Sequence, residues 1–510
     1  MTESAKPIRV LLYADAPAMV PQCVAAAEML RRELDVKIVM TVLDRETCSD
    51  EAFEKYEVYD HEDLFRWSSK LVPSAARKAS DASETDLLAG QNAIPVGTKR
   101  PRLGFRMVLA RSIRKIPSCA LNHYRRYRHI RAVGLIGQIV QACRGTLYVK
   151  RFLRNIRPDI IILAEDNIER LSSTFVYEGR KQGIPSIIIP FTIPNPLEPA
   201  KYYLHRKDHR VSSLASRLVS RFFPQWCYQL GDVKLLRLPA HSALVREAFG
   251  QSSPAPWILN RGLATKIAVD SEAQYDLYVR LGFPREQLSV VGDMYGVALY
   301  RSSANKQQFR SELLAKHGFA PEPPLILCGF PPNQFEGHDE EFEFQSYEAL
   351  VDAWIQSFAA LGSRANVLIR PHPRVPIKWL ESFASAQNVR YTLQPTAELI
   401  PLCDLYVASI SATIRWAIAC GIPVFNYDTY RLGYGDFDGL DGVIYTQELK
   451  DFRDQLARFV DDPSFAKTMV LQQQSVMHRW GVIDGDVPRR LGSLVREVIG
   501  VERVQAIEEK

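Results

Sequence analysis

The chain has 510 residues, of which 46% are hydrophobic, and a formal net charge of +6 at pH 7. This length is too great for one hydrophobic core and predicts two domains of about 200 to 300 residues each. No stretch approaches the ~20 consecutive apolar residues of a membrane span, and the first residues lack a signal-peptide pattern. The eight cysteines are scattered without a C-x-x-C pair, so neither a disulfide framework nor a zinc cluster is expected. We therefore expect a cytoplasmic protein.

The first 300 residues are predicted to form an α/β domain around a parallel sheet. Residues 8–14 and 36–43 have the pattern of strands, and a helix between them begins near Pro21. This order indicates a right-handed βαβ unit and a doubly wound sheet. No G-x-G-x-x-G motif follows the first strand, so dinucleotide binding by that route is not expected.

An insertion at about residues 46–150 interrupts this domain and includes most of a strongly basic segment. Residues 87–158 contain sixteen Lys and Arg but no Asp or Glu, which leaves 48 basic and 58 acidic residues elsewhere. A basic amphipathic surface of this kind is typical of binding to anionic lipid or a polyanionic glycan. The alternative is a solvated helix face whose arginine stems cover the core. Nucleic acid is not expected as a partner, because no nucleic-acid module surrounds the segment. The residues expected to form this surface are Arg111, Arg114, Lys115, Arg125, Arg126, Arg128 and Arg131.

A pair of carboxylates is the candidate catalytic group of this domain. Residues 159–164 form an apolar strand that ends on Glu165 and Asp166. Ligands of open α/β sheets bind beyond the C-terminal ends of the strands, where these side chains are expected. The alternative is that one of them only caps the following helix at 172–182. His205, His209 and His241 match no zinc spacing and are expected to be surface or loop residues.

The second domain, residues 309–485, follows a predicted linker near residues 302–308 and offers a candidate phosphate site. The apolar strand that begins at Val367 is halted by two prolines that bracket His372, with Arg370 and Arg374 on either side. Strand 405–408 leads into Ser409, Ser411 and Thr413 and then a helix at 414–420. A helix that starts beyond a parallel strand directs free N–H groups and a positive dipole end at an anion. The alternatives are a hydrogen-bonded histidine at a turn and plain N-capping by the hydroxyls.

The His-Pro unit at 372–373 and the Ser-x-Ser turn at 409–411 resemble the two-Rossmann-domain (GT-B type) glycosyltransferases of bacterial surface polysaccharides. The pattern is most similar to CMP-sugar-using Kdo and polysialic acid transferases and CDP-glycerol polymerases. The resemblance implies an α/β fold of two Rossmann-like domains facing a central cleft. Residues 1–300 would form the acceptor side, 309–485 would bind the nucleotide-sugar, and a helix within 486–510 would pack back across both domains.

The resemblance also implies a reaction and its residues. Asp166 or Glu165 would be the general base, and the donor phosphate would lie on Arg370, His372, Arg374, Ser409, Ser411 and Thr413. Ribose or base contacts would come from Asp428, Tyr430 and Tyr434. We expect a metal-independent, inverting glycosyltransferase of capsule or lipopolysaccharide assembly, with no cofactor, peripheral at the inner membrane. A CMP-sugar is favoured as donor, with a UDP-sugar as the alternative, and the acceptor would be a surface glycan or lipid-linked.

Two other functions remain open at the level of sequence. A UDP-N-acetylglucosamine 2-epimerase would have a similar layout. Such epimerases place two glycines and then paired glutamates after the serine, whereas this chain has Arg415 and Trp416 and no acid in the helix. The second alternative is a non-catalytic, basic, membrane-associated scaffold.

Overall fold

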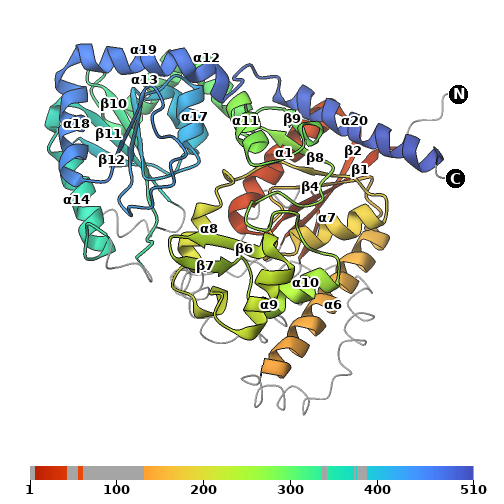
Figure 1. The fold of residues 1–510 in the computed structure, drawn as a ribbon. Coiled ribbons are helices and arrows are strands. Elements are labelled where there is room, and N and C mark those ends of the chain that lie inside the picture. Colours follow the sequence, from red (N-terminus) through yellow and green to blue (C-terminus); the bar gives the residue numbers. More distant parts are fainter. Residues whose placement is uncertain are drawn as a thin grey trace, which may run out of the picture.

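The computed structural model describes residues 6–42, 56–60, 131–335, 342–372, 375 and 388–508. They form two α/β domains that lie side by side, each built on a sheet of parallel strands (Figure 1). The predicted fold class, two Rossmann-like α/β domains, is confirmed by these sheets.

The N-terminal sheet has seven strands in the order β3-β2-β1-β4-β5-β8-β9. Their bounds are β1 (Ile8–Ala14), β2 (Val36–Val42), β3 (Glu57–Asp60), β4 (Ile160–Leu163), β5 (Ser186–Ile188), β8 (Lys266–Val269) and β9 (Leu288–Val290). The central strands are nearly continuous apolar runs, because helices cover both faces of a parallel sheet. Leu12 of β1, for example, is in register with Met40 and Ile162, and all three are buried.

Helices pack on both faces of this sheet. One core layer joins α1 to Val10 and Leu12, and the other joins α6, α7 and α11 to Leu11 and Tyr13. Alternate residues of β1 therefore pack into opposite core layers, because successive side chains of a strand point to opposite faces of the sheet. The helices are α1 (Val20–Glu33), α6 (Arg131–Ile156), α7 (Ser172–Lys181), α11 (Glu272–Arg280) and α12 (Gly296–Ala304).

Between β5 and β8 the chain forms a small subdomain, residues 197–248, which the sequence analysis did not predict. It lies at the lower edge of the N-terminal domain in Figure 1. Its core contains Trp226, Val219 and Ala243, and it also includes Ile168 from the loop after β4. The subdomain is therefore packed on the loop that carries the candidate carboxylates. Its elements are α8 (Leu197–Tyr203), α9 (Leu214–Phe222), α10 (Ala240–Ala248) and the antiparallel hairpin β6 (Cys227–Leu230) and β7 (Val233–Leu236).

The C-terminal sheet has six strands in the order β12-β11-β10-β13-β14-β15. Their bounds are β10 (Leu325–Phe330), β11 (Asn366–Pro371), β12 (Val389–Tyr391), β13 (Leu405–Ala408), β14 (Val424–Tyr427) and β15 (Val443–Thr446). The helices are α13 (Lys306–His317), α14 (Tyr347–Ala359), α16 (Thr396–Leu399), α17 (Ile414–Ala419), α18 (Leu449–Asp461) and α19 (Pro463–Trp480).

Helices occupy almost all of the predicted linker near residues 302–308. Helix α12 runs to Ala304 and α13 begins at Lys306, so only Asn305 separates them. No glycine or proline occurs between residues 297 and 317, so the sequence holds no strong helix breaker there.

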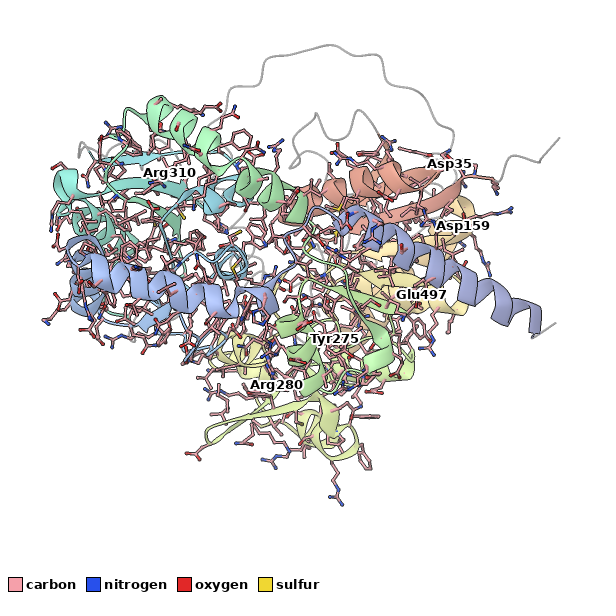
Figure 2. The ribbon with its side chains drawn as sticks, turned by 90° about the horizontal axis from the view of Figure 1, so that it is seen from above. Asp35, Asp159, Tyr275, Arg280, Arg310 and Glu497 are labelled. Atoms are coloured by element: carbon pink, nitrogen blue, oxygen red, sulfur yellow. The ribbon has the colours of Figure 1, made fainter. Side chains whose placement is uncertain are left out.

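The last helix, α20 (Val487–Glu508), leaves the C-terminal domain and packs on the N-terminal domain beside α1 (Figure 1). Val487, Leu491 and Val495 are buried in the same core layer as α1. Figure 2 looks onto this helix, where Glu497 forms an ion pair with Lys266 at 3.0 Å. Within the described ranges, no helix is both long and apolar enough to cross a bilayer.

Candidate functional site

The candidate phosphate-binding residues of the C-terminal domain lie at one edge of its sheet. His372 follows β11, and the hydroxyl turn, residues 409–413, follows β13. These two strands flank β10, and their register puts His372 and Ile410 at the same height along the sheet. Because neighbouring strands lie about 4.8 Å apart, the two backbone positions are separated by about 10 Å.

The hydroxyl turn is held by a chain of hydroxyl groups and by strained backbone. Thr413 Oγ1 lies 2.6 Å from the buried Tyr406 hydroxyl and 2.7 Å from Ser411 Oγ. Ile410 has a φ of 45°, a left-handed conformation that a β-branched residue rarely adopts. Its N–H donates to Asn426 Oδ1 at 2.9 Å. Such strain persists only where the surroundings enforce it, and it clusters at ligand-binding sites.

A glycine in β10 makes room for this hydroxyl chain. A Cβ at Gly329 would lie 2.3 Å from the Tyr406 hydroxyl oxygen, so a larger residue would displace it. Burial raises the pKa of Tyr406, which keeps its hydroxyl protonated next to Thr413. At the start of the turn, Ser409 Oγ accepts a hydrogen bond from the N–H of Thr429 at 3.3 Å. Tyr406 of β13 therefore positions the Thr413 hydroxyl, which contacts that of Ser411, and Thr429 after β14 positions the Ser409 hydroxyl.

The helix after the hydroxyl turn contributes less to anion binding than predicted. Helix α17 covers six residues, and Thr413 at its N-cap makes no side-chain capping bond. The macrodipole is the sum of aligned peptide dipoles, so a helix this short supplies little of it. The hydroxyls, rather than the predicted dipole, are therefore the main groups offered to an anion.

Arg370 lies beside His372 but is bonded to the protein. Its Nε donates to Gln394 O at 2.8 Å and its Nη1 to Pro371 O at 2.6 Å. Burial lowers the pKa of the Arg370 guanidinium from its ordinary value. These contacts hold the guanidinium against the chain that follows β12. Arg374, also predicted to bind phosphate, lies outside the described residues.

Two of the three residues predicted to contact ribose or base, Asp428 and Tyr430, are buried and hydrogen-bonded within the protein. Tyr430 is 3% exposed, and its hydroxyl donates to a backbone carbonyl of the loop after β10. Tyr434 is half-buried where the domains meet, and its carbonyl accepts from Asn195 Nδ2 at 3.0 Å. Asp428 is 0% exposed, and four donors converge on its carboxylate. These donors are the N–H groups of Leu432 and Gly433 and the side chains of Tyr445 and Gln447.

Three buried carboxylates lie at the corresponding edge of the N-terminal sheet. Glu165 and Asp166 follow β4, as predicted, and Asp15 follows β1, the strand next to it. Burial raises the pKa of Glu165 to about 7, and the nearby Asp15 adds to the shift. Burial also raises the pKa of Asp166 to about 7, against the opposing effect of Arg246. A carboxyl that titrates near neutrality is suited to exchanging a proton with a substrate.

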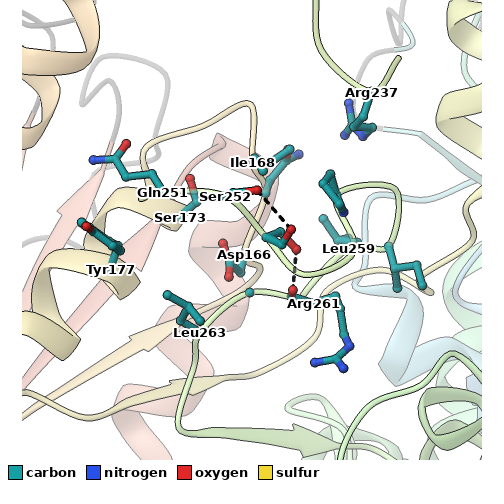
Figure 3. Close-up of a pocket in the computed structure, with 15 residues that line it drawn as sticks. Asp166, Ile168, Ser173, Tyr177, Arg237, Gln251, Ser252, Leu259, Arg261 and Leu263 are labelled. Atoms are coloured by element: carbon teal, nitrogen blue, oxygen red, sulfur yellow. Dashed lines mark hydrogen bonds between the residues drawn. The ribbon is translucent and has the colours of Figure 1, made fainter. Parts of the chain in front are cut away.

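Asp166 borders a pocket in the N-terminal domain (Figure 3). Its side chain lies among the lining residues, between Tyr177 of α7 and Arg261 of the segment before β8. Asn260 fixes its backbone, because Asp166 N–H donates to Asn260 Oδ1 at 2.8 Å and Asn260 N–H donates to Asp166 O at 3.2 Å. A Cβ at Gly262 would lie 1.7 Å from Asp166 Oδ2. Glycine at this position is therefore what lets the carboxylate sit there.

A second cavity, of about 260 Å³, adjoins this pocket, and both are lined by Ile168. It lies between α6, α7 and α10, and Arg144, Arg170 and Arg246 line it. Arg246 Nη2 donates to Ile168 O at 2.7 Å, and burial lowers the pKa of Arg246 to about 10. Arg246 therefore stays charged at neutral pH and balances the nearby Asp166.

A buried ion pair joins the two sheet edges across the domains. Arg415 of α17 contacts Asp270, which follows β8, at 2.7 Å, and Asp293, which follows β9, at 3.4 Å. Trp416 Nε1 donates to Asp293 Oδ2 at 2.8 Å. Burial raises the pKa of Asp270, and Arg415 opposes the rise. Because α17 directly follows the hydroxyl turn, Arg415 links that turn to the N-terminal domain.

Several sequence predictions concern other parts of the chain. In the described residues, no three His, Cys, Asp or Glu side chains are grouped to hold a metal ion. His209, expected to be a surface or loop residue, lies in a short turn, is buried and stacks on Tyr203 with ring centroids 3.8 Å apart. Of Arg131, only the backbone at the start of α6 is described. The rest of the predicted basic surface lies outside the described residues, namely Arg111, Arg114, Lys115, Arg125, Arg126 and Arg128.

Two parts of the site were missed in the sequence. Asp15 follows an apolar strand in the same way as Glu165, and this signal was present but not used. The link between Arg415 and Asp270 has no local signal, because each residue is an isolated charge in its own domain.

The comparisons with known proteins identify a fold rather than a family. No protein-family model matches the sequence, and no curated protein matches it. A variant of the wall teichoic acid polymerase TagF matches the structure with a TM-score of 0.50 and 10% identity, over 98% of this chain and 90% of that chain.

Two further solved structures match less well. The UDP-GlcNAc 2-epimerase from Neisseria meningitidis, bound to UDP-GlcNAc, gives a TM-score of 0.46 at 11% identity, over 96% of this chain and 100% of that chain. The glycotransferase of kitacinnamycin gives 0.46 at 12% identity, over 97% and 100%. Together with the two parallel sheets, the match to the polymerase shows that this chain has the two-domain α/β fold of the GT-B type.

Proposed function

We propose that the chain is a glycosyltransferase that moves a sugar from a nucleotide donor to a hydroxyl of a surface-glycan or lipid-linked acceptor at the inner face of the membrane. One observation carries this proposal. Carboxyls that titrate near neutrality lie at one sheet edge, and an imidazole with a hydroxyl turn lies at the edge of the other sheet. The ion pair of Arg415 joins these two edges. A wall teichoic acid polymerase shares the fold, in agreement with this assignment.

The C-terminal domain would hold the donor. In sugar transfer the bond between the anomeric carbon and the phosphate oxygen breaks, and negative charge develops on the departing nucleotide. His372 and the hydroxyls of Ser409, Ser411 and Thr413 are the groups that would bind this phosphate. Because the turn is held rigidly by Tyr406, its donors need little reorganisation when the charge develops.

The N-terminal domain would activate the acceptor. Asp166, which lines the pocket, would accept the proton of the acceptor hydroxyl as its oxygen bonds to the anomeric carbon. A single displacement of this kind inverts the configuration at that carbon. Burial, together with repulsion from Asp15, would keep the pKa of Asp166 near neutrality. The reaction as proposed requires no metal ion or cofactor, and a CMP-sugar is the favoured donor with a UDP-sugar as the alternative.

A nucleotide panel is the direct test of the donor site. The purified chain is mixed with CMP, CDP, UDP and GDP, and its thermal unfolding is recorded. We expect CMP or UDP to raise the unfolding temperature in the parent protein and not in His372→Ala. His478→Ala, which removes an exposed histidine at the end of α19, is the matched control and should keep the shift. The absence of a shift with every nucleotide in the parent protein would reject the proposal in favour of a scaffold.

Turnover separates the base from the donor site. With the nucleotide-sugar identified by the panel, release of free nucleotide is measured in the presence of glycan acceptors. Asp166→Asn should keep the nucleotide shift but lose turnover, whereas Asp232→Asn, on an exposed position of the 197–248 subdomain, should keep both. Unchanged turnover in Asp166→Asn would exclude it as the base. Epimerised nucleotide-sugar formed without acceptor, seen by NMR, would contradict a transferase.

A further inference from the structure

Helix α9 presents an apolar stripe to solvent. Leu214, Leu218 and Phe222 are 77%, 56% and 69% exposed. Residues spaced by four positions lie one above the other on a helix, so these side chains form a continuous stripe. The opposite side of the helix, which includes Ser216 and Val219, is buried in the 197–248 subdomain. The apolar surface of α9 therefore extends well beyond what the protein itself covers.

Arginines border the stripe on its outer side. Arg217 and Arg221 are exposed, and at about 100° per residue they lie on the flank away from the buried face. Residues 199–231 contain six Lys and Arg and one acidic residue, Asp208. On α9 itself, the two exposed arginines give the side next to the stripe a positive charge, which is complementary to an anionic partner. Apolar side chains with long cations beside them are typical of a helix that lies in a membrane interface. The guanidinium groups reach the phosphates there while their stems stay in the apolar layer.

The helix is formed and rigid without a partner. Ser213 Oγ accepts from Ser216 N at 3.1 Å, and Ser216 Oγ accepts from Ser213 N at 2.9 Å, which closes a capping box. Helix α9 lies at the lower edge of the N-terminal domain beside α10 (Figure 1). Single exposed apolar residues are ordinary on a protein surface, and Leu471 of α19, 57% exposed, is one. A stripe of three with arginines on its flank indicates a binding surface.

We infer that α9 binds a bilayer that contains anionic lipid, with Leu214, Leu218 and Phe222 among the acyl chains and Arg217 and Arg221 at the headgroup phosphates. The inference does not depend on the proposed transfer reaction. Its consequence for the site is orientation, because the core beneath α9 includes Ile168. The loop of the carboxylates would then be held at a fixed position relative to the membrane surface.

Vesicle flotation of the full chain tests this surface. The protein is mixed with phosphatidylcholine vesicles with and without phosphatidylglycerol, and the bound fraction is measured at low and high salt. We expect binding that requires phosphatidylglycerol. Changing Leu214, Leu218 and Phe222 together to Ser should weaken it at least tenfold, and Leu471→Ser should leave it unchanged. Changing Arg217 and Arg221 to Gln keeps the stripe and should remove most of the salt dependence.

Other results would overturn the inference. They are the absence of vesicle binding in the parent protein, or a triple Ser variant that floats as well as the parent. A dimer in sedimentation analysis that the triple variant dissociates would show that a second copy of the chain covers the stripe. The nucleotide thermal shift is recorded for every variant. A variant that keeps this shift but no longer floats has lost only the membrane contact, so the outcome is separate from that of the proposed function.

Discussion

Neutralising Glu165 should change how the stability of the protein depends on pH. The carboxyl is buried, and its pKa rises from 4.5 to about 7 in the folded protein. The folded state therefore prefers the protonated form. This contribution to stability is complete below pH 4.5 and is lost as the pH rises to about 7. Glu165→Gln carries no charge at any pH, so it should not lose stability over this range.

The size of the effect follows from the shift. One pKa unit corresponds to about 1.4 kcal/mol, so a rise from 4.5 to about 7 corresponds to about 3 kcal/mol. Relative to the parent protein, Glu165→Gln should gain about this free energy of unfolding between about pH 4.5 and about pH 8. The hydrogen bond from Asn167 Nδ2 to the Glu165 carboxylate can be kept by the Gln carbonyl, so the substitution should not disturb the loop.

The measurement is urea-induced unfolding followed by circular dichroism across this pH range. Glu286→Gln serves as the control, because Glu286 is an exposed carboxylate in the same domain. Its difference from the parent protein should stay small and nearly constant with pH. Parallel curves for Glu165→Gln and the parent protein would refute the reasoning, because they would mean that Glu165 is not buried as a proton-binding group.

The turnover rate should also depend on pH. Asp166, the proposed base, accepts a proton only when it is ionised, so activity should rise with pH through about 7.

Three further substitutions test the surroundings of the site. Arg415→Met should lower the free energy of unfolding by about 3 to 5 kcal/mol, since it leaves buried carboxylates without their counter-charge, and adding Asp270→Asn should recover part of the loss in urea unfolding. Gly329→Ala should weaken nucleotide binding in the thermal-shift panel, because its Cβ would displace the Tyr406 hydroxyl that holds Thr413, and Tyr406→Phe, which removes this hydroxyl, should weaken binding as well. Asp428→Asn should cost about 1 to 3 kcal/mol of stability, measured by urea unfolding, without changing nucleotide affinity in the folded protein. A selective loss of affinity there would instead support the original ribose assignment.

The elements that the sequence predicted well are those whose residues carry their own signal. Strand 8–14 and strand 405–408 are observed with the predicted bounds, because buried parallel strands are apolar runs ended by polar or turn residues. The location of Glu165 and Asp166 at the sheet edge could be predicted for the same reason, since residues that directly follow a parallel strand lie at that edge.

What could not be predicted depends on contacts between distant residues. Asp428 was predicted to contact the ligand because it follows a strand. The loop after it folds back, and its backbone N–H groups donate hydrogen bonds to the Asp428 carboxylate. The 197–248 subdomain has short elements and a mixed pattern, so its boundaries are set by packing around Trp226. The ion pair of Arg415 forms only after the two domains meet.

The position of α20 has a consequence for synthesis on the ribosome. The C-terminal domain is continuous from Lys306 to Trp480, so its core can close once that stretch has emerged. The N-terminal domain precedes it in the chain, yet Leu491 and Val495, which complete the N-terminal core, come after the C-terminal domain. The side of α1 that contacts α20 therefore stays uncovered until the whole C-terminal domain has been translated, and the N-terminal core is completed after the C-terminal core.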